Sequence, residues 1–322
     1  MRVLILHSDV SPGAPADEQD TLAQIPIIAD ALNAKGHRVS HAPFKPDREE
    51  LKALIARERP DMVFNLVEAV WGRGSYASIA VSMLSELGMP YTGTAAAAMM
   101  IGGDKLLTKQ VLVAAGLPTP AWAVPPDWTG VKGGRWIVKS VDEDSSLAID
   151  DAAVADGRAA VLARAEHCAG MHGGRWFAEE YIDGREFHVA VIEDGNSTRV
   201  LPVAEMVFEN WDASRPRIMS DSAKWDAASV EHARTVWKFD GAEEPALHAK
   251  LAELALKAFA LLGLSGYARV DFRVDTQGNP FILEINPNPS LALNCGMCAA
   301  AQRANMSYAD LIEAIVRAGQ RH

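Results

Sequence analysis

The chain has 322 residues, 49% of them hydrophobic and 23% charged, so it can bury a large core without disulfides or a structural metal. Its formal net charge of −11 disfavours nucleic acid as a partner, because phosphate binding needs clustered Lys and Arg. Its three cysteines are too few for a disulfide framework and indicate a reducing, cytoplasmic location, and no apolar run approaches the roughly 20 residues of a membrane span.

The first part of the chain alternates strand and helix patterns, which predicts a parallel sheet covered by helices. The predicted strands are residues 3–7, 38–42 and 62–66, and the predicted helices are residues 21–35, 78–87 and one that begins near residue 47. Pro26 should distort the first helix or lie near its start. Ligands of parallel sheets bind outside the carboxyl ends of the strands, so the loops "HSDVSPGAPADE" and "NLVEAVWGRGS" are candidate site loops.

The pattern changes after residue 94. Two short helices are expected on either side of Gly102-Gly103, followed by a Pro- and Gly-rich linker. Further along, the predicted strands are residues 135–140, 175–182, 188–192 and 200–206, and the predicted helices are residues 152–167, 245–262 and one from residue 307. We predict three domains, comprising residues 1–94, 95–184 and 185–322.

Residues 269–286 predict a β-hairpin with polar groups at one end of one face. In the simplest register Asp271 faces Glu284 and Arg269 faces Asn286. The other face would be apolar, carrying Val270, Phe272, Val274, Phe281, Leu283 and Ile285. Adjacent carboxylates repel each other unless a cation lies between them, and carboxylate and amide oxygens suit Mg²⁺ held together with substrate phosphates. The alternative is a solvated polar face.

Three lysines lie in polar surroundings: Lys105, Lys139 and Lys224. Each alone is typical of a surface lysine. Lys139, however, ends a predicted strand, and the loop "SVDEDSSLAID" that follows carries hydroxyl groups that could cover phosphates. The stretch "FAEEYIDGREF" places Glu179 and Glu186 around a strand and a Gly turn, where exposed backbone groups could bind a purine.

These motifs, in this order, resemble the D-alanine–D-alanine ligase group of the ATP-grasp superfamily. The matching stretches are "MPYTG", "DKLLTK", "IVKS…DSS", "AEEYIDGREFHVAVI", "AKW", "GYARVDF" and "FILEINPNP". The resemblance covers essentially the whole chain. It implies an α/β fold, in part α+β, with three domains. The parallel sheet would form the N-terminal domain, and ATP would bind between the central and C-terminal domains.

The resemblance also implies which residues hold ATP. Lys105 and Lys139 would contact the α- and β-phosphates, Lys224 would reach the γ-phosphate, and Ser145 would lie in the loop that covers them. The nucleoside would be bound by Glu179 at the adenine amino group, by the backbone of Glu180, Tyr181 and Ile182, and by Glu186 at the ribose.

For the reaction, the resemblance implies that Asp271, Glu284 and Asn286 bind two Mg²⁺ ions, with Mn²⁺ as an alternative. Arg269 would stabilise the oxyanion of a tetrahedral intermediate, helped by the amide of Ser290. In the N-terminal part, Glu18 and Glu68 would hold the ammonium group of the first substrate. Glu18 has an alternative role, because an acidic residue in the first turn of a helix is also favoured by the helix dipole.

The chain departs from the family in residues 289–298, which we call the acceptor loop because they would face the second substrate. The family has a Pro-Gly pair whose Gly amide helps form the oxyanion hole, whereas this chain has Pro289-Ser290, and a serine amide can still donate. The family's hydroxyl for the acceptor carboxylate is missing from "LALNCGMC", which predicts a more apolar wall. In the loop that covers the phosphates, this chain has Asp144 where the family usually has Gly. Cys295 and Cys298 give only a weak metal or redox signal and are expected to line or cap the pocket.

The sequence therefore predicts an ATP-dependent ligase that joins a carboxylate to an amine through an acyl phosphate, releasing ADP and phosphate. Its substrates would be small molecules, an amino acid or small peptide, with no nucleic acid and no membrane partner, and a homodimer is left open. Two alternatives remain: a genuine cell-wall D-alanine–D-alanine ligase, and an ATP-binding homologue without ligase activity. Because the acceptor loop departs from the family, we expect D-alanine not to be the preferred acceptor.

Overall fold

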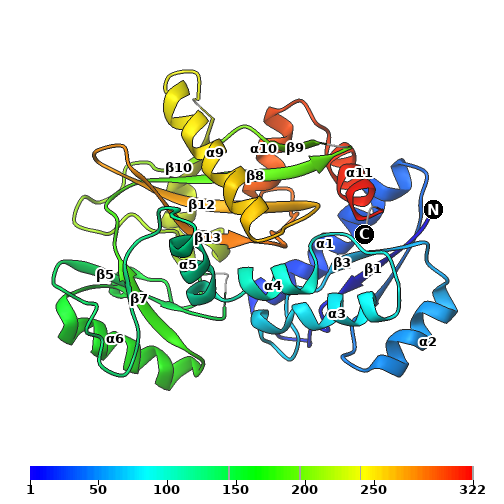
Figure 1. Cartoon of the computed structure of the whole chain (residues 1–322), viewed down its shortest axis with the longest axis horizontal. Helices are drawn as coiled ribbons and strands as arrows, with labels where there is room; N and C mark the ends of the chain where they lie inside the picture. Colours follow the sequence, from blue (N-terminus) through cyan, green and yellow to red (C-terminus); the bar gives the residue numbers. More distant parts are fainter. Residues whose placement is uncertain (144–145, 196, 240, 321–322) are drawn as a thin grey trace.

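The structure, a computed structural model, describes residues 1–143, 146–195, 197–239 and 241–320. Within these residues the strands form three sheets, which contain three, four and six strands (Figure 1). No helix in the described part of the chain is long and apolar enough to cross a membrane.

The N-terminal sheet is parallel, as predicted, with β1 between β2 and β3. Its strands are β1 (Arg2–His7), β2 (Arg38–Pro43) and β3 (Met62–Leu66), and its helices are α1 (Ala16–Ala34), α2 (Arg48–Glu58) and α3 (Ser78–Glu86). The predicted start of α1 is wrong, because the helix begins five residues earlier and contains Pro26 in its interior. Asp17 and Glu18 occupy the first turn, where the helix dipole favours acidic side chains.

The four-stranded sheet is antiparallel, in the order β4-β7-β5-β6. Its elements are β4 (Trp122–Ala123), β5 (Arg135–Ser140), β6 (Val154–Asp156), β7 (Trp176–Glu180) and helix α6 (Gly157–His172). The helix predicted at 152–167 therefore starts later than expected, because residues 154–156 pair with β5 instead. The split between α4 (Ala96–Gly102) and α5 (Lys105–Ala114) is confirmed. A Cβ atom at Gly102 would lie 2.9 Å from the Pro287 ring, so glycine lets α4 approach the end of the hairpin.

The largest sheet has the order β11-β10-β8-β12-β13, with β9 paired to β8. Its strands are β8 (Gly184–Asp194), β9 (Ser197–Val200), β10 (Ala204–Phe208), β11 (Thr235–Lys238), β12 (Tyr267–Asp275) and β13 (Pro280–Asn286). The associated helices are α7 (Asp221–Trp225), α8 (Val230–Arg234), α9 (Pro245–Leu261), α10 (Gly296–Arg303) and α11 (Tyr308–Gly319). The single strand predicted at 200–206 is wrong. It divides into β9 and β10 around Pro202, which has no N–H for a strand ladder.

The register of the β12–β13 hairpin is confirmed at its inner end, where Arg269 pairs with Asn286 and Asp271 with Glu284. The regular pairing stops immediately after these two pairs, because the register shifts between Asp271 and Phe272. The polar face predicted from the alternation of side chains is therefore present where the hairpin adjoins the rest of the molecule.

Beyond this bulge the predicted apolar face of β13 is wrong. Phe272 pairs with Ile282, which is fully buried, whereas Phe281 and Leu283 are only partly buried. One extra residue in a strand reverses the faces of the side chains beyond it. Leu283 consequently lines the large cavity described below instead of packing in the core.

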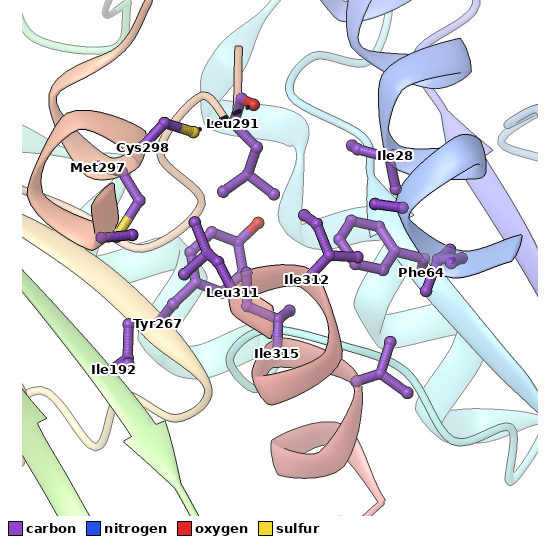
Figure 2. Packing of buried hydrophobic residues seen from close by; sticks show 14 of the residues in the cluster. Ile28, Phe64, Ile192, Tyr267, Leu291, Met297, Cys298, Leu311, Ile312 and Ile315 are labelled. Carbon is purple, nitrogen blue, oxygen red and sulfur yellow. Dashed lines mark hydrogen bonds between the residues drawn. The ribbon is translucent and has the colours of Figure 1, made fainter. Parts of the chain in front are cut away.

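Helix α11 packs between the N-terminal and the largest sheets and joins them through one core (Figure 2). Its Ile312 and Ile315 belong to the same buried cluster as Phe64 of β3, Ile28 of α1 and Tyr267 of β12. Residues of the first and last predicted domains thus share a hydrophobic core. The division at residues 94 and 184 remains a prediction.

Candidate active site

A cavity of about 910 Å³ is lined by residues of the four-stranded and the largest sheets, of their loops, and of the loops that follow β1 and β3. Every predicted site residue within the described part of the chain lines this cavity, and so do residues of both loops that were expected to form a site. Ser145 and Asp144 lie outside the described residues. Folding therefore gathers the predicted residues around one space, while their individual roles remain predictions.

The polar end of the hairpin is a hydrogen-bonded charge network. Arg269 donates from Nε and Nη2 to the two carboxylate oxygens of Asp271, each at 2.7 Å. The Asn286 amide donates to Asp271 at 3.1 Å and to Glu284 at 3.4 Å. Asp271 is 4% exposed, and burial alone would raise its pKa, but Arg269 beside it holds the pKa below its usual value. Asp271 is therefore a carboxylate in this network.

The same residues have the chemistry of a magnesium site. Two carboxylates and an amide oxygen are hard donors, and the Lys105 ammonium lies 3.8 Å from the Glu284 carboxylate. Among the described residues, no three His, Cys, Asp or Glu side chains close around one point to hold a metal alone. The donor set therefore suits an ion that takes its remaining ligands from phosphate oxygens and water.

A buried ion cluster surrounds Glu179. This side chain is 1% exposed, its Oε2 lies 2.7 Å from the ammonium of Lys109, and Lys139 donates to Oε1. Burial would raise the pKa of Glu179, but the two lysines outweigh it and lower the pKa to about 2. The sequence motif "DKLLTK" contains Lys109, but only Lys105 was predicted as a site residue. Their spacing of four residues places both on one face of α5.

The predicted purine edge is partly engaged by the protein itself. The Glu180 amide donates to the Ala121 carbonyl at 2.8 Å, and the Tyr181 amide donates to the Arg135 carbonyl at 3.0 Å. Within the described residues, the Ile182 amide donates to no backbone carbonyl. Of the three predicted backbone N–H groups, only that of Ile182 is therefore left to donate to a purine.

Glu186 lies in a second buried charge group that the sequence only partly revealed. Its carboxylate lies 3.3 Å from Arg273 Nη2 and 3.3 Å from His188 Nε2. Burial would raise the pKa of Glu186, but Arg273 and His188 lower it to about 2. Neither partner was predicted as a site residue. Only strand pairing brings Arg273 of β12 beside β8, whereas His188 lies two residues after Glu186 on β8 itself, a spacing that was not used.

The comparisons with known proteins identify the family. The family model described as the D-ala D-ala ligase C-terminus matches residues 135–317. The chain belongs to the D-alanine–D-alanine ligase family. It is therefore an ATP-dependent ligase that joins a carboxylate to an amine, and its predicted enzyme class is confirmed.

Two curated relatives and one solved structure illustrate the match. The D-alanine–D-alanine ligase of Bordetella pertussis is 34% identical over 257 residues, which cover 77% of this chain and 76% of the relative. The D-alanine–D-alanine ligase of a Synechococcus strain is 30% identical over 295 residues, which cover 89% of this chain and 84% of the relative. The crystal structure of the Bacillus anthracis ligase complexed with ATP has a TM-score of 0.76 at 19% identity, covering 100% of this chain and 98% of its own. This likeness confirms the predicted ATP-grasp fold.

In this family member, helix α1 holds the acceptor loop. Gln24 accepts a hydrogen bond from the Leu291 amide at 2.8 Å, and the Ser290 hydroxyl donates to Asp20 at 3.1 Å. Cys295 donates from its thiol to the Ser290 carbonyl at 3.0 Å. Gln24 and Asp20 were not predicted, because only the tertiary structure shows that they reach the loop.

Of the two cysteines expected to line or cap the pocket, only Cys295 lines the cavity. Cys295 lines the cavity and is the N-cap residue of α10, where its sulfur accepts a hydrogen bond from the Cys298 amide at 3.4 Å. Cys298 is buried, and its thiol donates to the Leu291 carbonyl at 3.4 Å. Both thiols therefore help to set the shape of the acceptor loop.

The expected apolar wall is wrong in two of its residues. Leu291 is fully buried in the shared core and Leu293 is exposed, so neither lines the cavity. Ala292 does line it, and so does Trp237 of β11. A Cβ atom on Gly296 would lie 3.3 Å from the Trp237 ring, so this glycine lets the indole pack against the start of α10.

Two cavity carboxylates have raised pKa values. Burial and the nearby Asp20 raise the pKa of Glu68 to about 7, against hydrogen bonds from Thr21 and Gln24 that lower it. Burial and Asp17 raise the pKa of Glu18. A positively charged ligand would relieve this repulsion, which agrees with the expected ammonium site.

We expect Glu68→Gln to remove part of the pH dependence of stability. The native state holds this proton more tightly than the unfolded state, so the free energy of unfolding should fall as the pH rises from 4.5 to about 7. The loss should reach up to about 3 kcal/mol. Urea denaturation at pH 5 and pH 8 measures it, with the exposed Glu166→Gln as the matched control. Equal pH dependence in wild type and Glu68→Gln would contradict this prediction.

Proposed function

We propose that this ligase activates the carboxylate of an amino acid or small peptide and joins it to an amine acceptor more apolar than D-alanine. The observation that carries this proposal is the acceptor wall, in which Trp237, Ala292 and Cys295 line the cavity. A free carboxylate at this wall would need charge-assisted partners, and leaving it unpaired would cost several kcal/mol.

The first step transfers the γ-phosphoryl group of ATP to the substrate carboxylate. The bond between the β-phosphate and the γ-phosphorus breaks, and an acyl phosphate and ADP form. Lys105, Lys139 and Lys224 face the cavity and would bind the phosphates. Mg²⁺, held by Asp271 and Glu284 with Asn286, would neutralise phosphate charge. Glu18 and Glu68 would hold the substrate ammonium so that its carboxylate faces the γ-phosphate.

The second step forms the amide bond. The acceptor amine attacks the carbonyl carbon of the acyl phosphate and loses a proton, giving a tetrahedral intermediate with a negatively charged oxygen. Arg269 and the Ser290 amide would stabilise this oxygen. The bond from carbon to the phosphate oxygen then breaks, releasing phosphate. The chain's contribution is mainly positioning and fixed charge.

A second candidate is a ligase of two D-alanine molecules, which the names of the relatives favour. The acceptor loop argues against it. The residues that follow Pro289-Ser290 on the cavity wall offer the Asn294 amide and the Cys295 thiol but no hydroxyl. The two candidates differ in their acceptor, and an activity screen separates them.

We expect a mixed pair of amino acids to exceed D-alanine alone in kcat/KM by tenfold or more, which corresponds to about 1.4 kcal/mol. The measurement is phosphate release over D- and L-amino acids and dipeptides, with the product identified by mass. If D-alanine with itself is best by tenfold, the acceptor proposal fails and the second candidate takes its place.

We expect ATP with Mg²⁺ to raise the Tm, because a ligand that binds only the native state stabilises it by mass action. At a hundredfold excess over Kd the gain is about 2.7 kcal/mol, and Lys139→Ala should lose most of it. Differential scanning calorimetry with and without nucleotide measures the shift. The exposed Lys132, just before β5, provides the matched control as Lys132→Ala. An unchanged shift in Lys139→Ala would remove this lysine from the nucleotide site.

A further inference from the structure

A row of three metal-binding side-chain types crosses the largest sheet. Strand β12 lies between β8 and β13, and Asp271 pairs with His188 on one side and with Glu284 on the other. Directly paired residues point to the same face of a sheet. All three line the cavity. His188 therefore lies next to the predicted carboxylate pair of Asp271 and Glu284. None of the roles proposed above for the ligase reaction uses it.

The hydrogen bond at Nε2 fixes the tautomer of His188. Nε2 lies 3.3 Å from a Glu186 carboxylate oxygen, and a carboxylate oxygen accepts. Nε2 therefore carries the proton, and in the neutral ring the lone pair is on Nδ1. The ring is 8% exposed and is held edge-on to Trp237, with centroids 4.8 Å apart.

The lone-pair side of His188 faces a negative charge. Its Nδ1 is buried and has no hydrogen-bond partner among the described residues. The carboxylate oxygen Oδ1 of Asp271, which also accepts from Arg269 Nε, lies 3.6 Å away. With the neutral ring, Nδ1 and Oδ1 are two facing acceptors that repel each other, and a metal cation between them removes that repulsion.

The 3.6 Å between His188 Nδ1 and Asp271 Oδ1 suits two ligands of one metal ion. With metal–ligand bonds of about 2.1 Å, two ligands at a right angle lie about 3 Å apart, and wider angles give larger separations. Histidine ligands usually donate their other ring N–H to a carboxylate, which sets the ring and its tautomer. Glu186 occupies this place beside His188.

We propose that His188 is a nitrogen ligand of the metal ion held by Asp271, and that it makes the site favour Mn²⁺ over Mg²⁺. The inference rests on the proposed metal–nucleotide function. Mg²⁺ strongly prefers oxygen ligands, whereas imidazole is a good ligand for transition ions. Asp271, Glu284 and Asn286 supply oxygen, and phosphate oxygens complete the coordination.

The test is pulsed electron paramagnetic resonance on the full-length protein with Mn²⁺ and ADP. Wild type should show ¹⁴N coupling from a directly bound imidazole together with ³¹P coupling from the nucleotide. Protein grown with ¹⁵N-histidine should lose the ¹⁴N coupling, and this arm requires no variant. In His188→Gln the ¹⁴N coupling should disappear while the ³¹P coupling stays, and the Kd of Mn²⁺ should rise tenfold or more relative to that of Mg²⁺.

His232 provides the matched control. It also lines the cavity, but its Nδ1 lies 2.9 Å from the Ala223 carbonyl and so serves as a donor. His232→Gln should keep the ¹⁴N coupling. Bound Mn²⁺ with ³¹P but without ¹⁴N coupling would overturn the His188 proposal and leave the proposed function standing. Absence of any Mn²⁺–ADP complex would overturn both.

Discussion

Glu284→Gln and Asp271→Asn are each expected to lower kcat/KM by about 10³-fold, or about 4 kcal/mol in the transition state. Glu284 and Asp271 are directly paired across the hairpin and face the cavity. An amide in place of either carboxylate removes a charged metal ligand where phosphate charge must be neutralised. Phosphate release at saturating Mg²⁺ measures the loss, and circular dichroism checks that the fold is retained.

Glu205→Gln is the matched control for this pair. Glu205 lies on β10 of the same sheet, is hydrogen-bonded to Arg185 at 2.7 Å and does not line the cavity. The turnover of Glu205→Gln should stay within about twofold of wild type, because this side chain does not face the cavity. Near-normal turnover by both cavity variants would exclude the hairpin as the metal platform. Glu284→Gln is the cleaner of the two, since Asp271→Asn also removes the partner of Arg269.

Lys109→Met is expected to lower the free energy of unfolding by about 3–5 kcal/mol. The Lys109 side chain is fully buried, 2.7 Å from Glu179 and 2.8 Å from the Thr119 hydroxyl to which it donates. Without it, Glu179 is left buried with Lys139 as its remaining cation. Burying a charge that has lost a partner is costly, whereas methionine nearly preserves the volume. Urea denaturation of the nucleotide-free protein measures the change.

The reason for this loss is tested by a double-mutant cycle. Lys109→Met combined with Glu179→Gln should be less destabilising than the sum of the single changes, because the unpaired charge is gone. Lys257→Met is the matched control, since Lys257 forms an exposed pair with Glu253 one helical turn away. Its effect should stay within about 0.5 kcal/mol. A loss below 1 kcal/mol for Lys109→Met would show that the cluster does not stabilise the fold.

Local patterns predicted the parts of this protein that local physics controls. Strand alternation predicted that Asp271 faces Glu284, since side chains alternate along every regular strand. The alternation of strand and helix patterns predicted the parallel N-terminal sheet. Helical spacing was also sufficient to find Lys109, which lies one turn after Lys105, although that signal was not used.

Features that depend on contacts between distant segments could not be predicted from local sequence patterns. The bulge after Asp271 turns Ile282 inward, and nothing in the alternation of β13 marks that shift. Helix α1 keeps Pro26 in its interior, and only the tertiary structure shows that Gln24 of this helix reaches the acceptor loop. Helix α11 packs against both Phe64 and Tyr267, which lie 203 residues apart in the chain.

The sequence by itself determined the family and the enzyme class, and it predicted the nucleotide and metal residues, because these depend on residue types in a fixed order. The tertiary structure alone decided which charges meet. Lys109 and Glu179 are 70 residues apart, and His188 and Asp271 are 83 apart, yet each pair is in contact or close to it. The reason is that strand pairing and burial, not spacing in the chain, bring such groups together. Once buried, a charge is stable only with a partner supplied by another element.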